Sequence, residues 1–446
     1  MIFTSYLILL ALTFLHPIEA FAPQLAEYRP VLVFSLIVLA FSIFDAVRTG
    51  VMAARARHLL LLGALMTAIV LSRVATGWAG GALPALVEFS APTLLFVVTI
   101  LVVTSIERLR MACGLLVLCM VLLSVAGIAA YHDGFMRDDL VVAEHGQVTD
   151  ELAVVPSDVI PADDDSGTTL WRIHSWGFLS DPNDFSQAIV MVLPMLMGAW
   201  LRRRSVRNLV RIWVPCALLV YASYLTHSRG AILGLGVIML FGLMRKLGGV
   251  RAGILLALFG VAVAVLGFTG GRSFSSGEAS AGGRIAAWSE GLVMLGAHPI
   301  FGVGFGNFTE HFYYTAHNSF VLCFAELGLF GYFFWVGMIV LSLKEMGQAA
   351  ELSPVDSPER RWAVLLRLSL LGFLTCALFL SRTFQPTLYV LLGLCIASWH
   401  CAQKTWNDNV ETQAPDVPWI GSTLRVMFIS IVVIYLIVRY QNAFVA

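Results

Sequence analysis

Long, continuous runs of apolar residues constrain this chain more than any other feature of its sequence. A membrane-spanning helix needs about 20 mainly apolar residues, because its peptide groups can be hydrogen-bonded only within the segment. The runs therefore predict an all-α, polytopic transmembrane helix bundle of about 12–13 spans. The expected spans lie near residues 5–22, 30–48, 57–75, 86–106, 109–131, 183–201, 208–226, 230–245, 251–268, 318–343, 363–381, 385–402 and 421–440.

The composition agrees with a membrane protein. Of 446 residues, 59% are hydrophobic and 13% are charged, against roughly 45–50% and ~25% in an average soluble protein. Too little polar surface remains for a soluble enzyme, a disordered chain or a disulfide-rich secreted scaffold. The seven cysteines fall in or beside apolar runs and form no CxxC pair. We expect them to be small buried residues rather than disulfides or metal ligands.

The first apolar run has two interpretations. It ends in Ala20-Phe21-Ala22, which resembles a signal-peptidase site, but no Lys or Arg precedes the run. Since secretory signal peptides begin with a basic segment, we expect this run to be a retained helix.

Basic residues are unevenly distributed between alternate connections. Nineteen of the 28 Lys and Arg residues fall on one side of the expected spans. Cytoplasmic loops carry an excess of such residues, so this side is predicted to be cytoplasmic, with the N-terminus inside and the C-terminus outside. Nine arginines remain for the outer side: Arg29, Arg73, Arg137, Arg172, Arg229, Arg272, Arg284, Arg382 and Arg439.

Two long connections fall on the predicted outer side. One is strongly acidic, with a net charge of −9 over residues 131–181, and the other carries ten glycines. The predicted organisation is N-terminal transmembrane helices (1–130), an acidic outer loop (131–182), central transmembrane helices (183–268), a Gly-rich outer loop that bears the candidate catalytic residues (269–317), and C-terminal transmembrane helices (318–446).

Arginines in short outer turns are the first candidates for chemistry. Arg229 lies in such a turn between two spans, and Arg284 follows a Gly-Gly pair at the start of a short helical pattern. A guanidinium is always charged and binds phosphate in a bidentate way. The alternative is that these side chains reach toward lipid headgroups or form structural ion pairs.

His317 lies at the outer start of an expected span. The helix dipole disfavours a charged imidazole there, which suits a general base. The alternative is an interfacial histidine bonded to a loop carbonyl. Glu326 lies nine residues further on, where a buried carboxylate either binds a partner or an acceptor, or is neutral and locks helix packing. Asn183 and Asp184 follow Asp181-Pro182, which indicates a capped helix start or a contact with a sugar.

Several short motifs run through residues 172–331 in a definite order. They are Gly177-Phe-Leu-Ser-Asp181-Pro182-Asn183-Asp184, Ser228-Arg229-Gly230, Arg284-Ile-Ala-Ala-Trp288, His298-Pro299-Ile-Phe-Gly302-Val-Gly304-Phe-Gly306-Asn307, His317-Asn318-Ser319, and Glu326-Leu-Gly328-Leu-Phe-Gly331. This series resembles the core of the O-antigen ligase and O-antigen polymerase superfamily.

The resemblance implies a multi-pass glycosyltransferase of the bacterial inner membrane, with its active site facing the periplasm. It implies His317 as the catalytic base and Arg229, Arg284 and Arg172 as residues that bind the donor diphosphate. Glu326, Asn318, Asn183 and Asp184 are expected to contact the acceptor or to serve the structure. No metal, nucleotide or other cofactor is expected, since the donor is already activated.

The expected partners are an undecaprenyl-diphosphate-linked glycan donor, a glycan or lipid A core acceptor, the lipid bilayer and other polysaccharide-assembly membrane proteins, with no nucleic acid. Polymerisation of exopolysaccharide or O-antigen repeat units is favoured. The alternative within the family is a ligase that joins the glycan to lipid A core or to a protein. The alternative outside it is a transporter of lipid-linked glycan. The acidic loop is expected either to cover the site or to disfavour acidic glycans.

Overall fold

The computed structural model describes residues 1–144, 170–200, 205–251, 253–255, 257–258, 279–408 and 416–445. Helices make up most of this part of the chain, which confirms the predicted all-α polytopic bundle. The acidic stretch 145–169, the basic residues 202–204 and most of the expected span 251–268 lie outside the described residues.

The helices of the first half alternate long spans with short turns. They are α1 (Ile2–Leu15), α2 (Pro17–Phe21), α3 (Pro30–Arg48), α4 (Val51–Ala54), α5 (Ala56–Ala75), α6 (Ala82–Glu88), α7 (Ser90–Val102), α8 (Ile106–Asp133), α9 (Arg137–Leu140) and α10 (Pro182–Leu196). Residue His16 has a left-handed conformation with φ 47° and ends α1 six residues before the expected boundary of that span.

The second half contains the longest helix of the chain as described. Its helices are α11 (Ser205–Asn208), α12 (Val214–Leu225), α13 (Arg229–Leu247), α15 (Ala279–Ala297), α16 (Phe308–His311), α17 (Ser319–Leu352), α18 (Pro358–Ala377), α19 (Pro386–Asp408) and α20 (Ile420–Val445). A π-helical turn, Leu209–Trp213, joins α11 to α12. The 19-residue helix α15 occupies much of the segment expected to be a Gly-rich loop.

Fewer helices than expected are long and apolar enough to cross a membrane. Among the described residues there are six, or seven if α6 and α7, which meet at 52°, form one broken span. Part of the difference from the expected 12–13 arises because α1 and α10 have only 14 and 15 residues, and α18 carries Glu359, Arg360, Arg361 and Arg367. Most of the expected span 251–268 lies outside the described residues and is not counted. The six are Pro30–Arg48, Ala56–Ala75, Ile106–Asp133, Val206–Leu225, Ser319–Leu352 and Ile420–Gln441.

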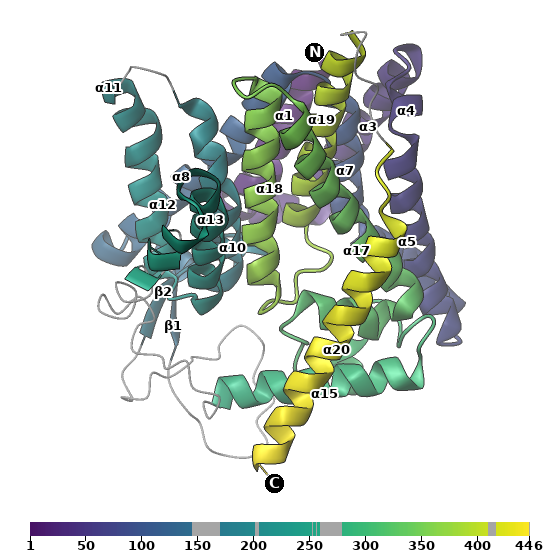
Figure 1. Cartoon of the computed structure of the whole chain (residues 1–446). Coiled ribbons are helices and arrows are strands. Elements are labelled where there is room, and N and C mark those ends of the chain that lie inside the picture. The colour runs from purple at the N-terminus through teal and green to yellow at the C-terminus, as the bar shows by residue number, and fades with distance from the viewer. Residues whose placement is uncertain are drawn as a thin grey trace.

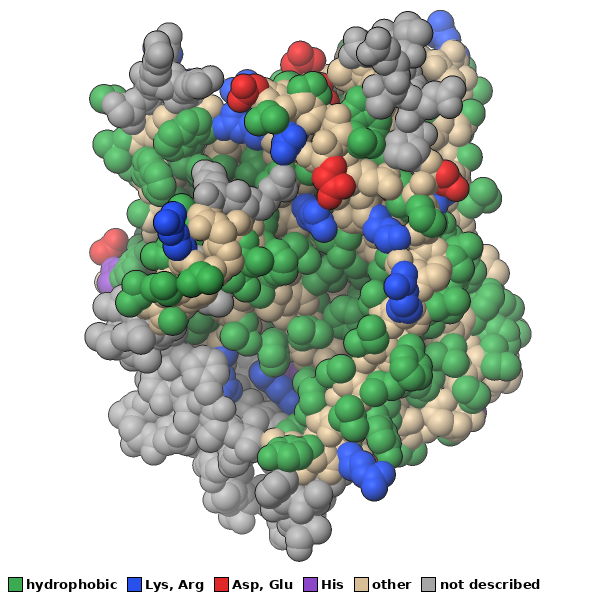
Figure 2. All heavy atoms as spheres, in the orientation of Figure 1, with side chains coloured by type: hydrophobic (Ala, Val, Ile, Leu, Met, Phe, Trp, Pro, Cys, Tyr) green, Lys and Arg blue, Asp and Glu red, His purple; other side chains and the backbone are tan. Residues whose placement is uncertain are grey.

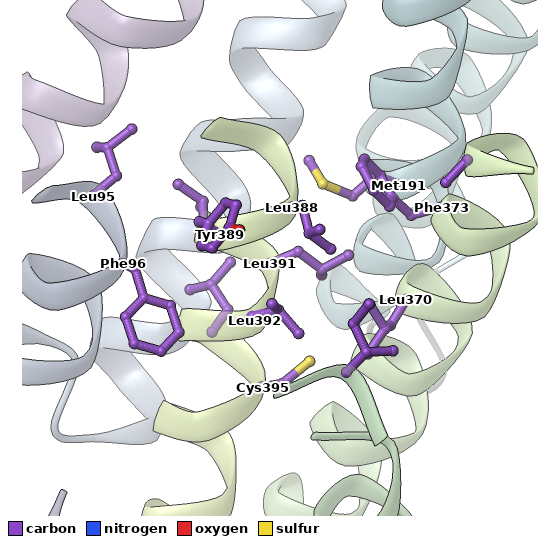
Figure 3. Close-up of a cluster of buried hydrophobic side chains, with 14 of the residues drawn as sticks. Leu95, Phe96, Met191, Leu370, Phe373, Leu388, Tyr389, Leu391, Leu392 and Cys395 are labelled. Atoms are coloured by element: carbon purple, nitrogen blue, oxygen red, sulfur yellow. The ribbon is translucent and has the colours of Figure 1, made fainter. Parts of the chain in front are cut away.

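The centre of the bundle is built around α19. In Figure 3 its residues Leu388, Leu391 and Cys395 point into a cluster that receives side chains from α7, α10 and α18. Lipid tails are as apolar as these side chains, so close packing contributes more to helix association in a bilayer than transfer out of water. Tyr389 accordingly packs edge-on against Phe89 with ring centroids 5.1 Å apart.

Glycines bring α10, α13 and α18 into close contact. A Cβ on Gly234 of α13 would lie 2.8 Å from Cys376 Sγ and 3.1 Å from the carbonyl oxygen of Gly372. A Cβ on Gly372 of α18 would lie 2.5 Å from Ile238. Small residues at helix interfaces are a common means of close approach in membranes, and here they fix the helices whose ends carry the candidate site.

The two ends of the bundle carry different elements. Figure 1 shows the N-terminus, α4 and α11 at one end, and α15, the C-terminus and a two-stranded sheet toward the other. The sheet pairs β1 (Val141–Glu144) with β2 (Leu170–Ile173) in antiparallel register, with Val142 opposite Arg172. The sequence did not predict these strands. Figure 2 shows extensive hydrophobic side chains over the middle of one face, with many Lys and Arg residues nearer the end that carries the N-terminus.

Helix α17 is broken at Gly328. This residue has φ 62° and ψ −170°, and the segment after α15 fills the break. The backbone N–H groups of Val303 and Gly304 donate to the carbonyls of Ala325 and Glu326 at 2.9 and 3.0 Å, and that of Leu329 donates to Pro299 O at 2.8 Å. The Gly-rich segment 299–306 is therefore a tight turn that is bonded to the middle of α17.

Candidate functional site

The turn before α17 holds His317 in a left-handed conformation with φ 46°, which is uncommon for a residue other than glycine. Asn318 follows and caps the helix, because its Oδ1 accepts hydrogen bonds from the N–H groups of Phe320 and Val321 at 2.9 and 3.2 Å. Asn318 is 1% exposed, whereas His317 is half-buried. The Asn318 cap thus fixes the turn, and the His317 imidazole next to it stays partly exposed.

A second turn, between α18 and α19, is bonded to this one. Ser319 Oγ donates to Leu380 O at 2.6 Å and accepts from the backbone N–H of Arg382 at 2.9 Å. Thr383 Oγ1 donates to Ser319 O at 2.7 Å. The guanidinium of Arg382 donates through Nε to Asp184 Oδ1, which ties this turn to the start of α10.

The start of α10 carries the next part of the site. Asp181 caps the helix by accepting the backbone N–H of Asn183 at 2.6 Å, which confirms the expected cap. Asn183 Oδ1 accepts a hydrogen bond from Arg172 Nη2 at 3.0 Å. Arg172 comes from β2, is 2% exposed, and also donates through Nε to Thr226 O at 2.6 Å. The unexpected sheet therefore positions one of the predicted arginines.

Helix α15 brings Arg284 to the same place. Trp288 lies one turn after Arg284, and its indole N–H donates to the carbonyl of Ala316 at 3.0 Å. This contact holds α15 directly against the residue that precedes His317. Arg284 is half-buried and near enough for its charge to influence the His317 imidazole.

The electrostatics of this group favour a neutral imidazole. Burial, together with the positive charges of Arg284 and Arg382, lowers the pKa of His317 to about 4, although Asp181 acts in the opposite direction. Burial alone would raise the pKa of Asp181, but Arg172, Arg382 and the bonds from Asn183 lower it. The site therefore holds a neutral base and an ionised carboxylate among several fixed cations at neutral pH.

Arg229 belongs to the adjoining turn. It is the first residue of α13, follows the left-handed residue His227, and is half-buried. The carbonyl of the next residue, Gly230, accepts a hydrogen bond from Cys376 Sγ at 3.4 Å. The same turn provides the Thr226 carbonyl that binds Arg172, so Arg229 begins its helix beside the rest of the group.

Glu326 lies apart from these arginines. It is 3% exposed, and its Oε1 accepts the backbone N–H of Phe308 at 3.2 Å. The nearby turn is fixed by Arg73, whose guanidinium donates to Asn307 Oδ1. The predicted site residues thus fall into two places. We call the first the His317 cluster, and it contains His317, Arg284, Arg382, Arg172, Asp181, Asn183 and Asp184.

Arg382 and Asp181 complete the cluster and were not among the predicted site residues. One signal for Arg382 was present in the sequence, because it is an arginine in a short turn that was predicted to lie on the outer side, against the charge bias of the other connections. Arg73 carries the same signal and fixes the turn near Glu326. By contrast, the guanidinium of Arg137, another arginine predicted to lie on the outer side, lies 4.3 Å from the centroid of the Trp171 ring.

The cluster combines a base with cations that suit a phosphorylated group. In the described part of the chain, no group of three or more His, Cys, Asp and Glu side chains could hold a metal ion. The chemistry available from the residues of this cluster includes removal of a proton by His317 and stabilisation of negative charge by arginine.

Residues 214–336 match the family model described as O-antigen ligase. This match confirms the predicted resemblance to the O-antigen ligase and polymerase superfamily. It covers Arg229, Arg284, His317 and Glu326. No curated protein matches the chain. Together with its apolar helices, the match supports a multi-pass membrane protein that handles glycans in the manner of O-antigen ligases and polymerases.

Proposed function

We propose that the protein transfers a glycan en bloc from undecaprenyl diphosphate to an acceptor hydroxyl at the periplasmic face of the inner membrane. The observation that carries this proposal is a half-buried, neutral His317 among the arginines of the His317 cluster. Arg284, Arg172 and Arg229 bind the diphosphate in this scheme. Arg382 supports the same site through its bond to Asp184.

In the proposed reaction the acceptor oxygen attacks the anomeric carbon of the donor sugar. His317 takes the hydroxyl proton as the new C–O bond forms. The bond from the anomeric carbon to the diphosphate oxygen breaks, and undecaprenyl diphosphate leaves with the electron pair, its charge stabilised by the arginines. Attack in line from the face opposite the diphosphate inverts the anomeric centre. A product with the anomeric configuration of the donor linkage would contradict this step.

We favour polymerisation of lipid-linked exopolysaccharide or O-antigen repeats, which uses the same donor chemistry as ligation. Transfer to lipid A core is the second candidate, because the matching family model is described as O-antigen ligase. A glycan transporter is less favoured, although broken helices are frequent in transporters. The break at Gly328 has its peptide groups bonded to segment 299–304 of the same chain.

The test uses a strain that lacks the protein. Lipid-linked and released glycans are extracted and their chain lengths compared after complementation with wild type, His317→Ala or His298→Ala. His298 is exposed on the same segment and serves as the control. Single lipid-linked repeats in the deficient strain identify a polymerase, and long lipid-linked chains with bare acceptor identify a ligase. Full restoration by His317→Ala would contradict the assignment of the base.

A further inference from the structure

A cavity of about 450 Å³ lies beside the His317 cluster. This is within the usual size range of small-molecule pockets, roughly 300–1,000 Å³. Thr315 and Ser381 form part of its wall, and their hydroxyls are hydrogen-bonded at 2.8 Å. Thr315 precedes His317 by two residues, which extend at most about 7 Å, and Ser381 directly precedes Arg382. The cavity therefore adjoins the proposed base.

The polar lining of this cavity differs from that of the His317 cluster. Glu88, at the end of α6, and Glu326, in α17, contribute carboxylates, and Thr309 and Gln385 contribute further polar groups. None of the described residues that line it is Lys or Arg. The guanidinium of Arg73 lies near the lining residue Gly306 but is bonded to Asn307 Oδ1, and the exposed carboxylate of Glu88 would repel an acidic sugar. The lining instead suits hydroxyl groups that donate hydrogen bonds.

Glu326 retains capacity to accept such bonds. Its carboxylate accepts hydrogen bonds from the backbone N–H groups of Phe308 and Gly306, and a carboxylate offers about four acceptor positions over its two oxygens. Gly306 allows further polar groups to approach. A Cβ on this residue would lie 3.3 Å from Arg73 Nη2 and 4.0 Å from Glu88 Oε2. The buried carboxylate of Glu326 and the exposed carboxylate of Glu88 thus both lie near the backbone of Gly306.

Aromatic rings supply the apolar part of the wall. Phe305 and Phe384 pack with centroids 4.7 Å apart, and Phe178 and Phe308 also line the cavity. The C–H faces of a pyranose ring pack well on such surfaces, while its hydroxyls reach the carboxylates at the edge. Specific pockets commonly combine an apolar lining with a few placed polar groups.

We propose that this cavity binds the neutral sugar at the end of the acceptor glycan, with Glu326 and Glu88 accepting hydrogen bonds from its hydroxyls. The inference rests on the proposed function. The donor diphosphate lies among the arginines, the acceptor sugar lies in the cavity, and His317 lies between the turns that border both. Transfer then depends on two sites that separate substitutions can distinguish.

The test uses the full chain in lipid nanodiscs and two measurements. One is binding of undecaprenyl diphosphate, and the other is glycan transfer with lipid-linked glycan extracted from the strain that lacks the protein. Thr309→Trp fills the cavity, and His311→Trp places the same ring on the same short helix outside the cavity lining. Both positions are exposed, so neither change disrupts buried packing.

We expect Thr309→Trp to reduce transfer by about tenfold or more because the ring occupies the cavity. We expect a similar reduction for Glu326→Gln, since loss of hydrogen bonds to a charged group has about this effect. Both variants should bind undecaprenyl diphosphate within about twofold of wild type. His311→Trp retains both properties. Arg284→Ala loses the binding of undecaprenyl diphosphate.

The outcomes separate the two proposals. Wild-type transfer by Thr309→Trp, with Arg284→Ala inactive, would overturn the acceptor cavity and leave the proposed function standing. If wild type binds no undecaprenyl diphosphate and Arg284→Ala transfers normally, the proposed function fails and the acceptor cavity with it. Glu326→Gln tests the hydrogen-bonding part, because loss of transfer only on Thr309→Trp would contradict a role for the carboxylate.

Discussion

Helix α17 connects two groups of charged and histidine side chains that differ in exposure and in their position in the fold. The His317 cluster lies at its start. The other, which we call the His58 cluster, contains His58 of α5, Glu345 of α17, and Arg55 and His400 nearby. Glu345 lies 26 residues beyond Ser319, roughly 40 Å along the helix at 1.5 Å per residue.

The histidine–carboxylate pair of the His58 cluster is shielded from solvent. His58 Nε2 lies 3.0 and 3.1 Å from the two carboxylate oxygens of Glu345, and the two side chains are 5% and 1% exposed. The rings of His58 and His400 meet edge-on with centroids 5.6 Å apart. His58 and Glu345 project from the interiors of their helices, whereas the residues of the His317 cluster lie mostly in turns and at helix starts. We therefore expect the His58 cluster to serve packing and the His317 cluster to serve chemistry.

Removal of each histidine gives the sharpest test of this difference. We expect His317→Ala to lower transfer by about 10²–10⁴-fold, the usual contribution of a general base, with little change in thermal unfolding. Transfer assays and melting curves on the same purified samples make the comparison. A large loss of thermal stability with unchanged transfer would place His317 in the structural class instead.

His58→Leu is expected to have the reverse effect. It leaves the carboxylate of Glu345 buried without its partner, which costs about 3–5 kcal/mol when a buried pair is broken. Thermal unfolding in detergent measures this loss. The double variant His58→Leu/Glu345→Leu removes both polar groups and should recover most of the stability. A stable single variant with impaired transfer would give the His58 cluster a functional role.

Gly328 lies between the two ends of α17, and its substitution tests how much the break in the helix contributes to stability. Gly328→Ala places a Cβ 2.3 Å from the carbonyl oxygen of Ile300 at a backbone conformation that nearly always requires glycine. The strain alone costs about 1–3 kcal/mol. Gly296→Ala, on α15 with open space around it, is the matched control and should be neutral or slightly stabilising. Equal unfolding temperatures for both variants would contradict this view.

The smallest expected effect is a shift in the dependence of transfer on pH. The pKa of His317 is lowered from its ordinary value to about 4 by burial and by Arg284 and Arg382. Its base form therefore persists as pH falls and is lost only near pH 4. Arg284→Gln removes one cause of the lowering, so the acid limb of its residual transfer should move to higher pH.

Arg137→Gln is the control for this shift, because Arg137 is exposed and stacks over Trp171. Its acid limb should coincide with that of wild type. Loss of wild-type transfer near pH 6.5 would contradict the environment described for His317.

Local features of the sequence were enough to predict some site residues. The Asp181-Pro182 helix start and the His317-Asn318 turn are marked by capping residues within a few positions. The bond between Arg382 and Asp184 joins residues 198 positions apart, and no local pattern predicts such a pair. The sheet that positions Arg172 was missed because one short strand follows a helix closely and both lack a long alternating pattern.

The break in α17 could not be predicted for a different reason. Residues 319–352 are continuously apolar enough to form one span, and an isolated glycine such as Gly328 is tolerated in a helix. The bonds that hold the break use backbone atoms of Ala325, Glu326 and Leu329, which every residue possesses. These backbone groups bond outside the helix because segment 299–304 packs against them, and that contact is not visible in the local sequence.

The hydrogen bonds between segment 299–304 and the break in α17 have a consequence for engineering. They connect α15, which carries Arg284, to the helix that carries Glu326, in one fixed register. Insertion or deletion of a single residue in this segment would shift every downstream pairing. A chimera built to exchange glycan specificity between relatives would therefore have to keep the number of residues in segment 299–304 unchanged, since these backbone bonds depend on register and not on side-chain identity.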